Sequence, residues 1–464
     1  MDIPYTFYDA TYLTALLKDL EQKFGANIDY SKLKDWIKSL DLIIDIYPNL
    51  PVECLSYNKF SDKLNTEHDA RSFIDKYFSV NAQSISAAII VKDEERCIKR
   101  CLDSILSVFD EVIIVDTGST DETLDILKNV NEPKMKLYST VWEYDFSKVR
   151  NFALEKVTSQ WVFFIDADEC FIAQPRDELK SLLALLSVFP DINSTAICPK
   201  IVNENEHCIT DLKRIFKTGT NFRYHGFVHE EARVWKENNW ELAKSISVNI
   251  PLMHDGYIDE VYIEKKKRNR DFSLSKMMLV KEPDDPRWIY FYARNAYGFI
   301  SDEELEKLLI EAILINHNME IEIRNLRSSE YTFALLNIWA EIALHEERLD
   351  KLLKIVACME TLSPKNSNVI YFRTLAKMLS LKHNSRDLLT DLMECRKAHH
   401  TFGQGGYHSE GYHIDFLIGL LLFGDRKFEE AFSYFDMLKN KFMPQDYMNS
   451  FDELVSICRN RQSR

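Results

Sequence analysis

The sequence predicts an α/β domain between two helical regions. Apolar residues recur at helical spacing between residues 10 and 80 and again beyond residue 259. Over residues 84–258, short apolar runs rich in β-branched residues alternate with amphipathic helical segments. Such alternation is typical of a parallel sheet with helices on its faces. We therefore expect a helical N-terminal region at residues 1–83, the α/β domain at 84–258 and a helical C-terminal domain at 259–464.

The composition is that of a globular protein, because 46% of the 464 residues are hydrophobic and 28% are charged. The formal net charge of −15 argues against a broad nucleic-acid surface, which needs clustered Lys and Arg. No window approaches the roughly 18 apolar residues of a membrane-spanning helix, and the first residues do not resemble a secretion signal. The nine cysteines lack the spacing of a disulfide framework. We expect a cytoplasmic protein with reduced thiols, no nucleic-acid partner and no membrane insertion.

Two helices are predicted in the N-terminal region. One apolar helical face runs from Leu13 to Leu20, and a second runs from Leu33 to Leu40. The pattern changes at Ser84, where consecutive apolar positions indicate a buried strand. The α/β domain is therefore expected to begin there.

The α/β domain is expected to continue with a helix over residues 94–106 and a second buried strand at 111–116. After this strand, Ser119 with Glu122 three residues later has the form of a capping box, which predicts a helix that starts at Ser119. The remaining elements are strands near 136–142, 161–166, 195–202 and 213–218 and helices over 147–157 and 177–189.

Four similar segments are expected in the C-terminal domain. They begin near Tyr290, Phe333, Tyr371 and Phe416, at separations of 43, 38 and 45 residues. Each has the pattern of a helical hairpin. Because these spacings exceed the roughly 34 residues of a tetratricopeptide unit, the domain is described as tetratricopeptide-like.

The strongest candidate for chemistry is the acidic pair Asp166 and Asp168, which follows an apolar strand. Ligands of open α/β sheets bind outside the carboxyl ends of strands, so both carboxylates are expected at one crevice. Hard oxygen ligands suit Mg²⁺ or Mn²⁺, and such an ion neutralises a departing diphosphate. The alternative is that the pair caps the next helix.

Two further groups are predicted to face the same crevice. Asp116 ends the strand at 111–116, where a carboxylate accepts from a uracil N3–H or a ribose hydroxyl; an ordinary turn aspartate is the alternative. Arg150 lies on the helix before the acidic pair and is a candidate for contact with a base or a diphosphate. An exposed helical arginine is the alternative for Arg150.

Four blocks, at residues 89–105, 115–123, 145–154 and 163–169, occur in an order and spacing that resembles the family 2 glycosyltransferases of GT-A (Rossmann-like) fold. Later HGFVHEE and HDGY blocks extend the likeness to near residue 258. The helical flanks are similar to those of sublancin-type peptide S-glycosyltransferases, which attach a sugar to a cysteine of a bacteriocin precursor (glycocin biosynthesis). Other bacterial members with tetratricopeptide tails act on surface glycans or other acceptors.

The resemblance implies a nucleotide-sugar site and gives roles to individual residues. Val91 and Glu94 would lie near the nucleoside, and Asp116 would hold the uracil or the ribose. Arg150 would lie by the base. Asp166 would be the first aspartate of the DxD motif, on the UDP-sugar.

The resemblance also implies a metal site. Asp168 would be the direct ligand of Mg²⁺ or Mn²⁺, and His254 would complete the site, with a hydrogen-bonded structural histidine as the alternative. The sequence departs from many relatives at Asp93, where those relatives have Asn. This departure puts the choice of nucleotide in doubt.

Family members of this kind invert configuration at the anomeric carbon, which implies a base opposite the metal. Glu230 is the expected base, with Glu231 and Asp255 as rivals and a surface carboxylate as the alternative reading. His225 and His229 are candidates to orient the acceptor or the base, or to fill a structural role.

The expected function is transfer of a hexose, with glucose first, from its UDP derivative to a cysteine, or a serine, of a small precursor peptide. The helical flanks, with the aromatic segment from Trp288 to Tyr297, would hold this peptide or form a homodimer contact, although these aromatic residues fit a hairpin core better. Two alternatives stay open. One is an enzyme that makes a surface saccharide or a lipid-linked glycan, and the other is an inactive scaffold whose helical repeats bind a partner.

Overall fold

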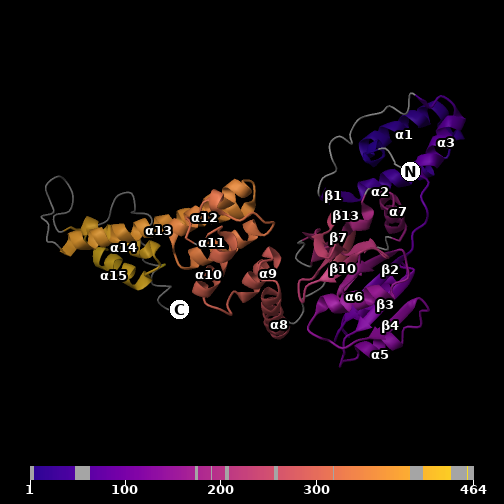
Figure 1. Ribbon diagram of the computed structural model, residues 1–464. Helices are drawn as coiled ribbons and strands as arrows, with labels where there is room; N and C mark the ends of the chain where they lie inside the picture. Colours follow the sequence, from indigo (N-terminus) through magenta and orange to yellow (C-terminus); the bar gives the residue numbers. More distant parts are fainter. Residues whose placement is uncertain are drawn as a thin grey trace. The chain divides into compact units, whose positions relative to one another are not determined.

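The computed structural model divides into two compact units, Met1–Pro283 and Asp284–Arg464. Each unit is described by itself (Figure 1). The three-domain division made from the sequence stays a prediction. The structure describes residues 5–47, 63–172, 176–189, 191–203, 208–254, 260–316, 318–397, 411–439, 441 and 457.

The first unit is built on a sheet with the strand order β1-β13-β7-β9-β5-β2-β3-β4. Four consecutive neighbours, β5, β2, β3 and β4, are parallel to one another, as the sequence predicts. These strands are β2 (Ile85–Val91), β3 (Glu111–Asp116), β4 (Met135–Ser139) and β5 (Trp161–Phe164). The helices that connect them are α4 (Ile98–Ile105), α5 (Thr123–Lys128) and α6 (Phe146–Lys156).

The other half of the sheet is mixed, because β9 runs antiparallel to both β5 and β7 while β13 is parallel to β7. The strands predicted near 195–202 and 213–218 are present as β7 and β9. The elements of this half are α7 (Arg176–Leu186), β6 (Glu169–Phe171), β7 (Thr195–Asn203), β8 (Cys208–Ile209), β9 (Ile215–Lys217) and β13 (Lys244–His254). A separate antiparallel sheet contains β10 (Phe222–His225), β11 (Glu231–Lys236) and β12 (Asn239–Leu242), and α8 (Glu260–Lys281) follows β13.

The N-terminal helices α1 (Ala10–Phe24), α2 (Ser31–Asp41) and α3 (Glu67–Phe78) share the core of the sheet. Tyr8 packs its ring 4.4 Å from that of Phe189, and Trp36 donates to the carbonyl of Phe7 at 2.7 Å. Figure 1 shows α2 beside α7. The region also supplies a strand that the sequence does not predict, β1 (Ile43–Tyr47), which pairs antiparallel with β13.

The capping box predicted at Ser119 and Glu122 is wrong. The helix begins at Thr123, and Glu122 occupies the capping position without a side-chain bond. Ser119 instead accepts a hydrogen bond from the backbone N–H of Asp93, in the loop after β2, at 3.0 Å. The Ser119 hydroxyl thus bonds a neighbouring loop instead of capping its own helix. A local sequence pattern does not predict such a contact between loops.

The second unit is helical, and three of the four expected hairpins are present. The first is α9 (Pro286–Ala296) with α10 (Asp302–Ile313), the second α11 (Thr332–His345) with α12 (Leu349–Leu362), and the last α14 (Tyr412–Gly424) with α15 (Phe428–Leu438). The expected hairpin at Tyr371 is wrong, because Tyr371 lies in one continuous helix, α13 (Ser367–Lys397). Trp288 is buried in this unit, in agreement with a hairpin-core role.

Candidate active site

The candidate site lies where β2, β3 and β5 end. Val91 is the last residue of β2, Asp116 is the last of β3, and Asp166 and Asp168 come two and four residues after β5. Because the three strands are parallel, their carboxyl ends share one edge of the sheet. The sequence-predicted carboxylates are therefore brought to one edge.

A backbone hydrogen bond and a bond from backbone to side chain join the segments that follow β2 and β3. The N–H of Thr117 donates to the carbonyl of Val91 at 3.0 Å, and the N–H of Thr120 donates to Oδ1 of Asp93 at 2.6 Å. Asp93 has a positive φ of 54°, a conformation that Asp and Asn tolerate better than most residues. An Asn carbonyl oxygen would accept the same bond. The described loop contacts therefore do not distinguish Asp from Asn at this position.

Asp116 is buried, and both of its carboxylate oxygens accept bonds from its own turn. Gly118 N–H donates to Oδ2 at 2.9 Å, and Ser119 N–H donates to Oδ1 at 3.1 Å. These bonds form the turn that the sequence offered as the alternative role. A carboxylate can accept about four hydrogen bonds, so Asp116 can accept further bonds besides those of its turn. Its contact with the nucleoside stays a prediction.

Glu94 lies in the loop after β2 and is partly buried. The thiol of Cys97 donates to its Oε2 at 3.0 Å. Burial raises the pKa of Glu94, and the nearby carboxylate of Asp168 raises it further. Burial and the bond to Glu94 also hold the pKa of Cys97 well above its ordinary value, so Cys97 is a thiol that positions Glu94 rather than a reactive thiolate.

Two arginines hold the carboxylate of Asp166. Arg214, at the start of β9, donates from Nη1 to Oδ1 at 3.0 Å and from Nη2 to Oδ2 at 2.5 Å. Arg150 donates from Nη2 to Oδ1 at 3.0 Å. Burial alone would raise the pKa of Asp166, but the two guanidinium groups outweigh it and hold the pKa far below its usual range. Asp166 is therefore a fixed anion.

Arg214 and Glu169 are site residues that sequence reasoning missed. Glu169 is 2% exposed, accepts from the N–H of Asp166 at 2.8 Å and lies 3.5 Å from Arg214. Burial raises the pKa of Glu169 despite the arginine. The available signal was a charged residue directly before a short apolar segment, Arg214 before Ile215 and Phe216 and Glu169 before Cys170 and Phe171, because a charge that is buried with such a segment requires a partner.

Arg150 connects Asp166 to the predicted base. Its Nε donates to Oε1 of Glu230 at 2.6 Å. Its guanidinium carbon lies 5.6 Å from the ring centre of Phe164 and 5.2 Å from that of Tyr224. Arg150 is buried, so the alternative that it is an exposed helical arginine is wrong. Two ion pairs and two rings fix its position.

The two candidate bases on the HGFVHEE segment differ in their partners. Glu231 has both oxygens engaged, with Arg233 Nε at 2.9 Å from Oε1 and Lys213 Nζ at 3.2 Å from Oε2. Glu230 uses Oε1 for Arg150, and no hydrogen bond within the described residues occupies its Oε2. The third candidate, Asp255, lies outside the described residues. Glu230 is thus better placed than Glu231 to accept a proton.

Asp168 and His254 are brought together from positions 86 residues apart, with Nε2 of His254 3.2 Å from Oδ2 of Asp168. The other ring nitrogen, Nδ1, lies 2.9 Å from the side-chain oxygen of Asn203. His254 and Asn203 are direct partners in the β13–β7 pairing. An amide oxygen accepts only from an N–H, so Asn203 favours the tautomer with the lone pair on Nε2, toward Asp168. When the ring is protonated, Nε2–H donates to Asp168, and this bond raises the pKa of His254.

These residues fit part of the coordination shell of a divalent cation. A carboxylate oxygen and an imidazole nitrogen suit Mn²⁺, and a carboxylate suits Mg²⁺. Over the part of the chain that the structure describes, no three His, Cys, Asp or Glu side chains converge on a point that could hold a metal. Remaining ligands would then come from diphosphate oxygens and water, as is usual for Mg²⁺.

Comparison with known proteins assigns the central segment. Residues 86–239 match the family model described as glycosyl transferase family 2. This segment is a family 2 glycosyltransferase domain. The chain is similar to the SPbeta prophage-derived glycosyltransferase SunS of Bacillus subtilis, with 28% identity over 350 residues that cover 74% of this chain and 79% of the relative. It is also similar to a TPR repeat-containing protein of Synechococcus elongatus, with 32% identity over 165 residues, 34% of this chain and 39% of that protein.

The family 2 glycosyltransferase domain has the GT-A-like fold that the sequence predicts, with helical regions before and after it, but its sheet is mixed rather than wholly parallel because β9 is antiparallel to its neighbours. Its chemistry is glycosyl transfer, and enzymes of this family take nucleotide-sugar donors. A solved structure of S. aureus TarS, 14% identical, matches 61% of this chain and 92% of its own at a TM-score of 0.32, a likeness too low to carry any argument. Among the described helices, none is both long and apolar enough to span a membrane.

Other polar residues of the glycosyltransferase domain have structural partners. Asn151 bonds both backbone groups of Tyr224, at 2.9 and 2.8 Å, and so fixes α6 to β10. Nε2 of His225 lies 2.9 Å from Glu282, just after α8, and burial lowers the pKa of His225. His229 has a positive φ of 52° in the turn before Glu230. The structural reading fits His225.

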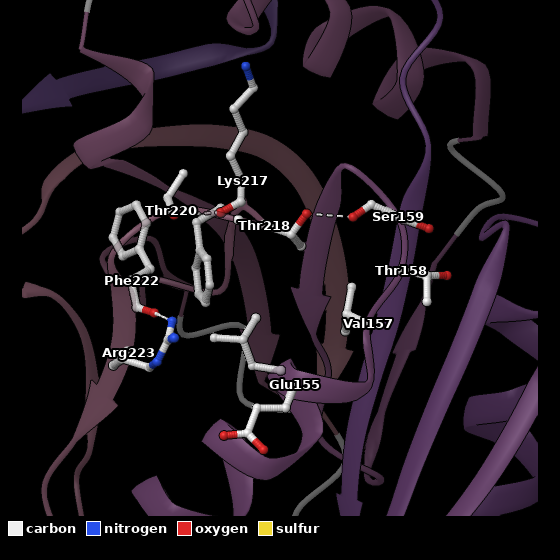
Figure 2. A pocket seen from close by; sticks show the side chains of 12 residues that line it. Glu155, Val157, Thr158, Ser159, Lys217, Thr218, Thr220, Phe222 and Arg223 are labelled. Atoms are coloured by element: carbon white, nitrogen blue, oxygen red, sulfur yellow. Dashed lines mark hydrogen bonds between the residues drawn. The ribbon is translucent and has the colours of Figure 1, made fainter.

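A hollow of about 310 Å³ lies at the opposite, amino end of β5 (Figure 2). Its polar side chains bond to backbone within the hollow: Thr218 Oγ1 donates to the carbonyl of Ser159 at 2.5 Å, and Arg223 donates to that of Phe222 at 2.6 Å. Neither Asp166 nor any other predicted site residue lines it. The hollow is therefore separate from the candidate site.

Proposed function

We propose that this chain transfers a hexose, with glucose as the first choice, from a UDP-sugar to a cysteine, or a serine, of a bacteriocin precursor peptide, with inversion at the anomeric carbon. One observation carries the proposal. The pair Asp168 and His254, 3.2 Å apart, stands beside Asp166, which Arg150 links in turn to Glu230. Arg150 thus connects the proposed donor-binding carboxylate, Asp166, to the proposed base, Glu230.

The donor side of this arrangement is formed by fixed anions and loop backbone. Asp166 is held by Arg214 and Arg150 in one orientation, which suits hydrogen bonds from sugar or ribose hydroxyls. Val91, Glu94 and Asp116 stand at the ends of the neighbouring strands and are assigned to the nucleoside. Asp168 and His254 would hold Mg²⁺ or Mn²⁺, which supplies positive charge for the departing diphosphate.

Glu230 is assigned as the base. Its Oε2 would take the proton of the acceptor thiol as the sulfur bonds to the anomeric carbon and the bond from that carbon to the diphosphate breaks, releasing UDP. A thiol has an ordinary pKa of about 8.5, so it needs far less activation than a serine hydroxyl. A base weakened by an ion pair with Arg150 is sufficient for a thiol. This difference favours cysteine as the acceptor.

One comparison supports the peptide acceptor. The likeness to SunS spans 350 residues and so extends beyond the transferase domain at 86–239 into helical sequence. The flanks are the part of the sequence that resembles peptide S-glycosyltransferases. The chain's location in the cytoplasm and its assembly as a homodimer are proposed on the same resemblance.

The direct test is intact-mass spectrometry of a peptide after incubation with the protein, UDP-glucose and Mn²⁺. Three matched peptides carry Cys, Ser or Ala at one position. We expect one added hexose on the Cys peptide, slower addition to the Ser peptide and none to the Ala peptide, with Asp168→Asn protein as the inactive control. No hexose on any peptide with any UDP-sugar would refute the proposal, and transfer to a lipid-linked or surface saccharide would support that alternative instead.

A further inference from the structure

Helix α8, which follows β13, carries basic side chains onto the glycosyltransferase domain. The guanidinium carbon of Arg270 lies 5.1 Å from the ring centre of Phe146, the first residue of α6. The ammonium group of Lys281 lies 4.9 Å from the ring centre of Phe227. These two rings belong to neighbouring segments, because the N–H of Phe146 donates to the carbonyl of Phe227 at 3.0 Å. One side of α8 therefore lies against the start of α6 and the segment that leads to Glu230.

Lys267 lies on the same side of α8 as these two contacts. Residues that are three, seven, eleven or fourteen positions apart point to one side of an α-helix, because a turn contains about 3.6 residues. Lys267 precedes Arg270 by three positions and Lys281 by fourteen. Leu274 and Met278 fall on this side between them, and both are buried, whereas Lys267 is exposed. The side of α8 that contacts the domain thus begins with an exposed ammonium group.

The ammonium group of Lys267 lies near the carboxylates of the candidate site. Burial raises the pKa of Glu94 and the charge of Asp168 raises it further, while the charge of Lys267 acts in the opposite direction. Lys267 and Asp168 are therefore both within electrostatic range of the same carboxyl group. The chain connects them closely as well, because α8 starts six residues after His254, whose ring contacts Asp168.

The charge of Lys267 is not used by a partner, unlike that of the arginines around it. Arg150 and Arg214 both bond Asp166. Arg270 donates to the adjacent carboxylate of Asp271 at 2.9 Å. Among the residues that the structure describes, none forms a hydrogen bond or an ion pair with Lys267. A diphosphate brings negative charge to this edge of the sheet and gains more when its bond to the sugar breaks, so an unused cation here has a natural ligand.

We propose that Lys267 binds the diphosphate of the UDP-sugar and stabilises it as the leaving group. This inference rests on the proposed function, because it names a further catalytic residue for that donor. As the bond from the anomeric carbon to the β-phosphate oxygen breaks, its electron pair stays on that oxygen, and the ammonium group of Lys267 donates a hydrogen bond to the diphosphate. The proton of the acceptor still goes to Glu230. Lys267 thereby adds to the positive charge that a metal ion at Asp168 and His254 would supply.

The test is Lys267→Met, which removes the charge and keeps most of the length of the side chain. In calorimetric titration with Mn²⁺ present, we expect this variant to bind UDP about tenfold more weakly than the parent, and we expect its kcat to fall about thirtyfold. Its affinity for uridine, which has no phosphate, should be unchanged in an NMR titration. Lys267→Arg should recover most of both losses. Lys276→Met is the matched control, since Lys276 is exposed on the opposite side of the same helix, and it should behave as the parent does.

Three results would overturn this inference and leave the proposed function standing. The first is a UDP affinity and a kcat of Lys267→Met that equal those of Lys276→Met. The second is an equal loss of affinity for UDP and for uridine, which would assign Lys267 to the nucleoside. The third is a Lys267→Arg variant as weak as Lys267→Met, which would show that the charge is not what matters. A parent that binds neither UDP nor a UDP-sugar overturns the proposed function as well.

Discussion

Both ends of the parallel strands hold hydrogen-bonded carboxylates, and the two ends differ in how many carboxylate oxygens are left without a partner among the described residues. At the amino end, Glu111 accepts from Ser86 at 2.5 Å, from Lys136 at 2.7 Å and from the N–H and hydroxyl of Thr158 at 2.9 and 2.8 Å. All of these hydrogen-bond donors are groups of the protein itself. Burial opposes the charge, but the bonds outweigh it and lower the pKa of Glu111 to about 2.

At the carboxyl end, the side chains of Asp168, His254 and Glu230 use only part of their hydrogen-bonding capacity within the described residues. The described bonds of Asp168 and His254 join them to each other and join His254 to Asn203, while Glu230 keeps one oxygen unbonded. A saturated cluster stabilises the fold, whereas a cluster with unused ligand positions is a functional candidate. We therefore expect substitutions at the amino end of the sheet to change stability, and substitutions of Asp168, His254 or Glu230 at the carboxyl end to change activity.

The largest effect on stability is expected from Arg214→Met. It leaves the half-buried anion of Asp166 with one arginine in place of two and removes the cation beside the buried Glu169, and breaking a buried ion pair from one side costs roughly 3–5 kcal/mol. Urea unfolding measures the loss. Arg223→Met, which removes an exposed guanidinium bonded only to a neighbouring carbonyl, is the control and should stay within about 0.5 kcal/mol of the parent. Equal urea midpoints for Arg214→Met and the parent would show that the bonds from Arg214 to Asp166 do not stabilise the fold.

The next effect concerns the base. Glu230→Gln should lower kcat about a hundredfold, because the amide oxygen still accepts from Arg150 but cannot take up a proton. Glu231→Gln should lower it much less, since both oxygens of Glu231 already have cationic partners. Rates at saturating donor and peptide decide between them. The reverse order would move the assignment to Glu231.

A smaller change is expected from Asn203→Ala. Loss of the acceptor on Nδ1 of His254 should weaken Mn²⁺ binding in the presence of UDP about tenfold, since residues that orient metal ligands typically matter by that much. Asn203→Asp should retain the affinity, because a carboxylate also accepts from Nδ1–H. Titration followed by the EPR signal of free Mn²⁺ reports binding without turnover. Unchanged affinity in the Ala variant would show that Asn203 does not orient the histidine.

The smallest effect on transfer is expected from Glu111→Gln, which should leave kcat and KM at the parental level. It should lower the free energy of unfolding at pH 7 by about 1–3 kcal/mol. The pKa of Glu111 is about 2 in the folded protein against an ordinary 4.5, so its stabilisation is complete above pH 4.5 and is lost as the pH falls toward 2. Unfolding curves of parent and variant should therefore converge over that range. A constant difference down to pH 2 would exclude Glu111 as the titrating group.

The sequence predicts the regular part of the fold well. Consecutive apolar positions identify β2, β3 and β5, and the alternation with helices implies their parallel order. The short strand β1 escapes prediction because its pairing with β13 is long-range. The long helix α13 escapes because a repeat spacing does not show where a helix ends.

The sequence predicts those residues of the candidate site whose positions depend only on where a strand ends. Asp116, Asp166 and Asp168 follow strands, so topology alone gathers them. Arg214 is different, because its contact with Asp166 depends on the antiparallel placement of β9 beside β5, which no local pattern encodes. Ser119 likewise bonds a separate loop in place of its own helix.

The central claim is that the carboxyl end of β5 binds the metal and the diphosphate of the donor, and calorimetric titration of UDP tests it most directly. UDP should bind the parent at least about tenfold more tightly with Mn²⁺ than with EDTA, because Asp168 and His254 supply only part of a coordination shell. Asp168→Asn should remove this difference while its unfolding curve matches that of the parent. UDP affinity that is the same with Mn²⁺ and with EDTA, or that keeps its full dependence on Mn²⁺ in Asp168→Asn, would contradict the account.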